Sequence, residues 1–238
     1  MTAKDLFQAG RLGEAVQALG IELRSNPADA QRRTFLFELL CFAGEYDRAE
    51  KQLDILADTS KEAGMGSLVY RSALHAERLR AGMFANNTLP LDSDPPTVAG
   101  VLNGAPFETI EDADPRIGAR LEVFAAGAYL WLPFQHIASI EMGPPKRLRD
   151  LLWIQAFLRT GPAFKGKELG EVLLPALAPL SSRHSDDEIR LGRKTEWLDQ
   201  PDGAALPLGQ KMLLIDGEEF PVLEVRKLEL TATPATVQ

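Results

Sequence analysis

Apolar and small residues recur at a fixed interval in the first part of the chain. Leu6 and Leu40 are 34 positions apart, and so are Gly10 and Gly44. The same interval separates two further pairs, Ala15 from Ala49 and Leu19 from Leu53. This pattern predicts two helical hairpins, each with a tight turn at its glycine, where a positive φ is easily adopted.

A 34-residue period with alanine five positions after the turn glycine is typical of tetratricopeptide repeats. Asn26-Pro27 ends the first copy, because proline interrupts a helix. A third hairpin is predicted around 68–79, with a break at Gly64 and Gly66 and a degenerate turn at Ala81-Gly82. The helical region is thus expected to span 1–85.

Residues 86–104 carry turn-forming side chains and no sustained period, which predicts a linker. Beyond it, apolar runs flank Ala126-Gly127 and Asp216-Gly217, and such dipeptides favour β-hairpins. The predicted arms are 121–124 with 129–132, and 211–215 with 221–225. Further strands are predicted near 137–142, 151–158 and 171–177, and a short helix over 185–191 with Ser185 as its N-cap. The expected fold class is α+β: N-terminal tetratricopeptide-like helical repeats followed by a mostly β C-terminal domain at 105–238.

Composition narrows the class of protein. The chain has 238 residues, of which 45% are hydrophobic and 25% charged, which excludes a wholly disordered chain. Its net charge of −8 argues against nucleic-acid binding. The longest uncharged apolar run, 123–134, is too short to span a bilayer, and the N-terminus lacks a secretory signal, so we expect a cytoplasmic protein without membrane insertion. The single cysteine, Cys41, is expected to be a small buried hydrophobic residue.

Catalytic signals are weak. His75, His136 and His184 are scattered singly, and no phosphate-binding loop or nucleophile elbow is found. We therefore predict no catalytic residue, no cofactor and no metal site. One alternative stays open: an enzyme or small-ligand-binding module in the β domain, with Asp186, Asp187 and Arg190 facing a pocket.

Protein binding is the better-founded expectation, because stacked helical hairpins form a concave face that accepts peptides. Side chains between the periodic core positions are the candidates there: Arg32, Arg33, Phe37 and Arg71.

Two further candidates, Arg147 and Arg149, lie in a dense basic segment at 146–150 and would bind an acidic peptide. The alternative for this run is a solvated turn, with Arg149 and Asp150 paired inside their own domain.

The predicted helix near 187 adds three more candidates, namely Asp187, Arg190 and Arg193. The alternative is that acidic residues at the start of a helix and basic residues at its end only complement the helix dipole. Three tryptophans in the β region, Trp131, Trp153 and Trp197, are predicted to be core residues.

Several C-terminal segments together resemble the ImpE/TagJ family. These segments are 103–108, 129–134, 148–153, 187–197 and 208–210. The resemblance covers nearly the whole chain, with the helical repeats first and the family-specific region after them.

The resemblance implies a non-enzymatic accessory protein of bacterial type VI secretion. It also implies a cytoplasmic partner: an N-terminal helix of the small subunit of the contractile sheath. The ATPase that recycles contracted sheath would then be an indirect partner. The oligomeric state and the face that binds are not determined by the sequence.

Overall fold

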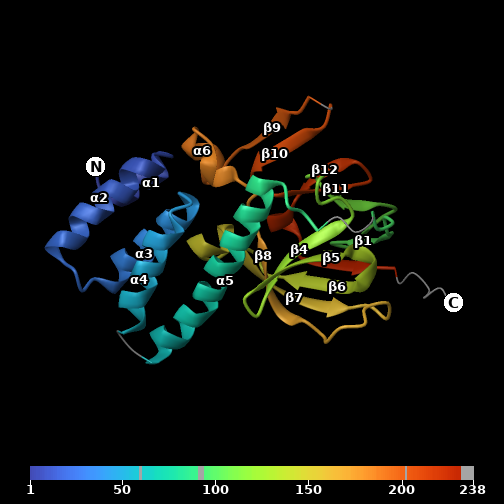
Figure 1. Ribbon diagram of the computed structural model, residues 1–238, viewed down its shortest axis with the longest axis horizontal. Coiled ribbons are helices and arrows are strands. Elements are labelled where there is room, and N and C mark those ends of the chain that lie inside the picture. Colours follow the sequence, from blue (N-terminus) through green and yellow to red (C-terminus); the bar gives the residue numbers. More distant parts are fainter. Residues whose placement is uncertain (59–60, 91–93, 202, 232–238) are drawn as a thin grey trace.

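The computed structural model describes residues 1–58, 61–90, 94–201 and 203–231, with helices first and strands after them (Figure 1). Part of the predicted linker, 91–93, and the end of the predicted C-terminal region, 232–238, lie outside the described residues. The fold class is α+β, as predicted. The helices are α1 (Ala3–Gln8), α2 (Leu12–Ser25), α3 (Ala30–Phe42), α4 (Tyr46–Ala57) and α5 (Lys61–Asn86).

The two predicted turn glycines have the same geometry. Gly10 has φ +73° and Gly44 has φ +72°, both in the left-handed region that glycine adopts without strain. After each glycine, the next backbone N–H donates to a carbonyl five positions back, Leu6 in one turn and Leu40 in the other, at 2.9 Å. Helix α1 packs on α2, and α3 packs on α4. The 34-residue spacing therefore corresponds to two equivalent helix pairs.

Gly10 and Gly13 provide a matched test of these turns. A Cβ at Gly10 would lie 1.8 Å from the Oε1 atom of Glu188, whereas a Cβ at Gly13, in α2, would meet no atom within 4 Å. We expect Gly10→Ala to lower the free energy of unfolding by about 1–2 kcal/mol, because alanine is strained at positive φ. Gly13→Ala is expected to raise it by about 0.5–1 kcal/mol. Chemical denaturation of both variants checks this; equal effects would contradict it.

The predicted third hairpin is wrong, because α5 is one continuous helix through Gly64, Gly66 and Ala81-Gly82. Each glycine inside a helix costs only about 1 kcal/mol, which tertiary packing outweighs. The buried side chains that hold this helix in place are Ser67, Ala73, Leu74, Ala76, Arg80 and Phe84.

The strands form one large antiparallel sheet and two small ones. The large sheet has the order β2-β1-β13-β6-β7-β8-β4-β5. Its strands are β1 (Gly100–Leu102), β2 (Ala105–Phe107), β4 (Arg120–Ala125), β5 (Ala128–Pro133), β6 (Ile137–Met142), β7 (Trp153–Thr160), β8 (Gly170–Pro175) and β13 (Lys227–Leu230). A three-stranded sheet contains β3 (Ile110–Asp112), β11 (Met212–Ile215) and β12 (Glu218–Pro221), and a hairpin contains β9 (Thr195–Asp199) and β10 (Ala205–Gly209).

Both predicted hairpins are present, one with a corrected arm. Strands β4 and β5 pair around Ala126-Gly127. Around Asp216-Gly217, the returning strand is β12, not the predicted 221–225, and residues Val222–Glu224 form a 3-10 turn. The two-residue turn sets this register, because it places Ile215 directly opposite Glu218. Strand β1 lies within 86–104, the segment predicted to be a linker.

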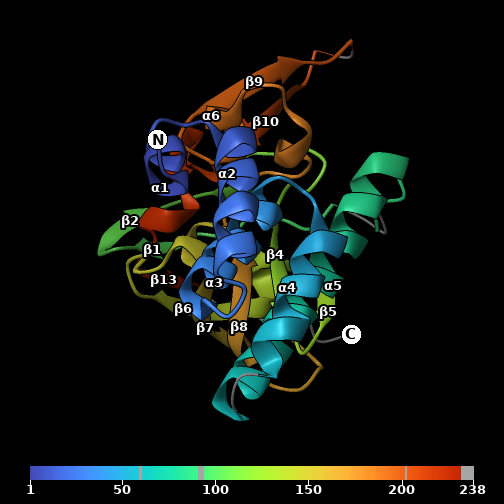
Figure 2. The ribbon, with the colours of Figure 1, turned by 90° about the vertical axis from the view of Figure 1, so that its left-hand side faces the viewer.

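Helices and sheet share a hydrophobic core. The core of the helical part continues into the sheet through Phe124, Leu152, Trp153 and Leu191. A second cluster fills the interior on the sheet side. Cys41 is buried at 3% exposure, as predicted. Figures 1 and 2 show the helices stacked along one side of the strands.

Candidate functional site

The short helix α6 (Asp187–Arg190) lies against the ends of the N-terminal helices. Its N-cap is Asp186, not the predicted Ser185, because the Asp186 carboxylate accepts from the backbone N–H of Glu188 at 2.9 Å. Asp186 also lies 3.6 Å from the Nζ atom of Lys194. Both contacts lie within the α6 segment, and the Asp186 side chain is 43% exposed.

The predicted binding residues of this segment contact the helix pairs. Arg193 donates to the carbonyls of Phe7 (2.7 Å) and Gln8 (3.2 Å), at the end of α1. Arg190 donates to the carbonyl of Ala43, the C-cap of α3, at 3.3 Å. Asp187 accepts from the backbone N–H of Gly13 at 3.2 Å. Because helix C-termini carry partial negative charge, the two guanidinium groups complement the helices that they meet.

Arg149 joins the sheet side to α3 and α5. It forms an ion pair with the buried Glu38 at 3.1 Å, and its guanidinium lies 4.9 Å from the centre of the Tyr70 ring. Burial raises the pKa of Glu38 although Arg149 opposes the shift. The carboxylate of Asp150 accepts from the backbone N–H groups of Lys146 (2.8 Å) and Arg147 (2.9 Å). The basic run thus contains one inward arginine and two exposed cations.

The candidates on the helices are dispersed. Arg32 pairs with Glu22 and Asp29, and Arg71 pairs with Asp54 at 2.6 Å. Arg33 donates to Gln52 and to the carbonyl of Pro27.

Phe37 needs a correction, because its side chain is only 1% exposed. Its ring lies against that of Tyr70, with centroids 5.9 Å apart. Phe37 is a core residue, and no partner reaches it at the surface.

Residues of the C-terminal part pack on the helix pairs, which were expected to receive a peptide. Four residues pack on the helical core, the half-buried pair Leu148 and Leu151 and the buried pair Leu152 and Trp153. The first two belong to a 3-10 turn, Leu148–Leu151, and line a small pocket together with Phe7 of α1 and Phe42 of α3. The C-terminal part of the chain therefore covers part of the surface of the helix pairs.

An open groove lies beside this covered region, between α5 and the sheet. Its volume is about 700 Å³. Leu68 and Val69 of α5 line it and are 63% and 51% exposed. The other lining residues include Tyr70, Ala73, Phe124, Trp153, Val172, Leu173, Lys146, Arg147, Asp150, Gln155 and Glu171. The groove thus combines apolar walls with charged groups, and it includes one predicted binding residue, Arg147.

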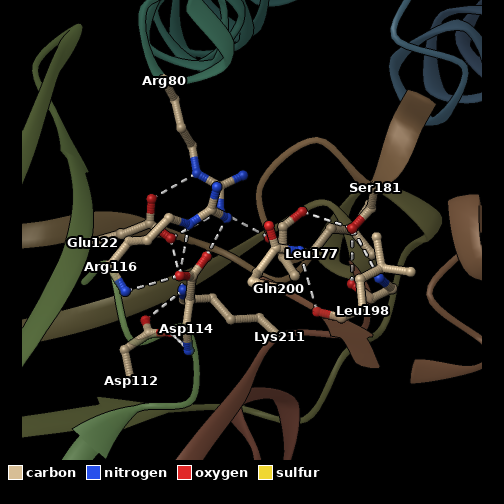
Figure 3. Close-up of polar contacts among 12 residues, drawn as sticks. Arg80, Asp112, Asp114, Arg116, Glu122, Leu177, Ser181, Leu198, Gln200 and Lys211 are labelled. Atoms are coloured by element: carbon tan, nitrogen blue, oxygen red, sulfur yellow. Dashed lines mark hydrogen bonds and ion pairs between the residues drawn. The ribbon is translucent and has the colours of Figure 1, made fainter. Parts of the chain in front are cut away.

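A buried ionic network anchors α5 to the sheet (Figure 3). Arg80 of α5 donates to both carboxylate oxygens of Glu122, at 2.7 and 2.8 Å, and to the carbonyl of Leu177 at 2.9 Å. The Nζ atom of Lys211 lies 2.6 Å from Glu122 and 2.5 Å from Asp112. All four charged side chains are at most 2% exposed.

The network shifts the pKa values of its two carboxyl groups in opposite directions. Burial opposes the charge of Glu122, but Arg80 and Lys211 hold the pKa of this carboxyl well below its usual range. Burial raises the pKa of Asp112 to about 7, because Lys211 compensates for burial only in part and the Glu122 carboxylate adds repulsion. The charged side chains of this network form ion pairs with one another. None of the four lines the groove.

The raised pKa of Asp112 predicts a pH dependence. The folded state holds this proton up to about pH 7, whereas an unfolded aspartate loses it near its ordinary value of 3.8. The contribution of Asp112 to stability is therefore greatest at low pH and is lost as pH rises through 7. We expect the free energy of unfolding of the wild type, minus that of Asp112→Asn, to fall between pH 5 and pH 8. Urea denaturation across this range measures it, and a rising difference would contradict it.

No local feature of the sequence indicates this charged network. Its members come from distant parts of the chain, and nothing local distinguishes Arg80 from Arg78. Within the described residues, no cluster of three or more His, Cys, Asp or Glu side chains is arranged to hold a metal ion. No helix in this described part is both long and apolar enough to cross a membrane.

Fold and site together define an α+β protein in which paired helices pack on an antiparallel sheet beside an open groove. The ImpE protein family model matches residues 104–229. The type VI secretion system accessory component TagJ of Pseudomonas aeruginosa is 35% identical, over 99% of this chain and 93% of the relative. The chain belongs to the ImpE family. The crystal structure of protein VPA1032 from Vibrio parahaemolyticus has the same fold, with a TM-score of 0.84 and 22% identity over 98% of each chain.

Proposed function

We propose that this protein is a non-enzymatic, cytoplasmic accessory protein of type VI secretion that binds a helical segment of the small sheath subunit. Through that contact it influences sheath assembly, or sheath recycling by the ATPase. The Pseudomonas relative is an accessory component of type VI secretion, which supports this class of role. Tetratricopeptide-like stacking of the helix pairs, with the repeats at 1–85 and the sheet domain at 105–238, is part of the same proposal.

The groove between α5 and the sheet is the observation that carries the proposal. It is open and lies along a helix, and the exposed Leu68 and Val69 line it. An amphipathic helix binds in such a groove by burying its apolar face. The rival, an enzyme or small-ligand module around Asp186, Asp187 and Arg190, has less support, because these side chains contact the chain itself.

Fluorescence anisotropy tests the proposal with a labelled peptide from the N-terminal helix of the cognate small sheath subunit. The full-length protein is required, because removing residues 1–85 would expose the core residues Leu152 and Trp153. We expect micromolar or tighter binding, weakened about tenfold or more by Leu68→Asp. Ile21→Asp is the matched control, because Ile21 is 59% exposed on α2 and does not line the groove.

Absence of binding by every sheath peptide would refute the proposed partner. Equal weakening by Leu68→Asp and Ile21→Asp would refute the groove as the site. Retention of the wild-type thermal midpoint by both variants shows that the comparison concerns binding and not folding.

A further inference from the structure

We propose that the groove selects an amphipathic helix with an acidic flank, whose carboxylates pair with Lys146 and Arg147 while its apolar face lies on α5. This inference rests on the proposed function and specifies the chemistry of the segment that is bound. Three features of the structure support it: the apolar wall, the neighbouring internal contact and the exposed charges.

The apolar wall has helical periodicity. Met65, Leu68, Val69 and Ala73 lie along α5 at intervals of one turn, and the first three are more than half exposed. Leu68, Val69 and Ala73 line the groove, and Phe124 lines it from the sheet side. An α-helix has a diameter of about 10 Å, and its i, i+3 and i+4 side chains form a matching apolar stripe. Burying this wall removes apolar surface from water.

The groove continues an interface that already holds a helical turn. The 3-10 turn Leu148–Leu151 packs its two half-buried leucines against the helical core, and Arg149 lies over Tyr70. Tyr70 and Trp153 belong to this internal contact and also line the open groove. The chain therefore shows, next to the groove, that this surface accepts a helical turn with an apolar face and a charged flank.

The exposed charges beside the groove indicate that the flank of the bound helix is acidic. Lys146 and Arg147 are exposed on the groove rim, and neither forms a salt bridge with another of the described residues. The nearby Asp150 is already engaged by their backbone N–H groups. Two cations are therefore available to carboxylates of a bound helix. Glu171 of β8 also lines the groove, so acidic side chains are favoured beside the cations and disfavoured beside β8.

Two synthetic helical peptides of about 18 residues, long enough for roughly five turns, test this charge preference. They share one leucine face and differ in one flank, which carries Glu in the first peptide and Lys in the second. Titrated into the full-length protein, the Glu peptide is expected to bind about tenfold more tightly at low salt. The preference is expected to decrease in high salt, because exposed charges are screened.

The double variant Lys146→Glu/Arg147→Glu is expected to abolish or reverse this preference. Lys165→Glu/Lys167→Glu is the control, because it makes the same change in net charge on exposed residues that do not line the groove. Equal affinities of the two peptides, no binding by either, or equal loss of the preference in both double variants would each overturn the inference.

The sheath-helix peptide is titrated in parallel to separate the two proposals. If it binds the wild type and the charge preference is absent, the acidic-flank inference fails while the proposed function stands. If the Glu peptide shows the expected preference and no sheath peptide binds, the groove chemistry stands and the proposed partner fails.

Discussion

Replacing Arg80 with alanine is expected to lower the free energy of unfolding by about 3–5 kcal/mol, the loss typical of breaking a buried ion pair. The guanidinium of Arg80 holds both oxygens of Glu122 and the carbonyl of Leu177, and its side chain is 2% exposed. Without it, Glu122 shares one remaining cation, Lys211, with Asp112. The variant thus leaves an under-compensated carboxylate in the interior.

Arg78→Ala is the matched control for Arg80→Ala. Arg78 lies on the same helix and pairs with Asp47 and Glu50, but its side chain is 31% exposed. Because exposed ion pairs contribute little, its loss is expected to change stability by at most about 1 kcal/mol. Urea denaturation of both variants makes the comparison. Similar effects for the two arginines would show that the network does not anchor α5.

Trp153→Ala is expected to lower the free energy of unfolding by about 3–5 kcal/mol, as large core truncations do. Trp153 is 3% exposed and belongs to the core that helices and sheet share. Its indole N–H also donates to Glu77 of α5, at 3.1 Å. The substitution removes packing and a hydrogen bond at one position, so the thermal midpoint is expected to fall by roughly 6–20 °C.

Trp197→Ala is the control, because Trp197 is only half-buried in the β9–β10 hairpin. Its effect on stability is expected to be about 1 kcal/mol, since truncation at a partly exposed site leaves no closed cavity. An unchanged midpoint in Trp153→Ala, with partner binding lost, would show that Trp153 serves an interface and not the core. The prediction that all three tryptophans are core residues is confirmed only for Trp153, since Trp131 is also half-buried.

Local signals predicted much of the fold. Gly10 and Gly44 mark turns whose geometry depends on neighbouring residues alone, and the same holds for the hairpin turn at Asp216-Gly217. Elements that depend on distant partners were missed. Strand β1 has three residues and pairs with β13, at the other end of the described chain. The continuity of α5 through its glycines likewise depends on packing against α4 and the sheet.

The candidate site was predicted less well, for a related reason. Charge and exposure were read from sequence spacing, but the pairing of a charged side chain depends on the tertiary fold. Arg190 and Arg193 therefore resembled surface binding residues, although they meet the C-terminal ends of α3 and α1. Arg147 lies beside an open surface, and its role in binding stays a prediction. Leu68 and Val69, on the apolar side of that surface, fall in the predicted third hairpin, which does not form.

Photo-cross-linking to the purified small sheath subunit tests the central claim, docking in the groove, most directly. A benzophenone residue is placed at position 69, in the groove, or at position 21, on the exposed face of α2. The proposed function predicts that position 69 cross-links to a helical segment of the subunit and that position 21 does not. Cross-links from position 21 alone, or none from position 69, would contradict it.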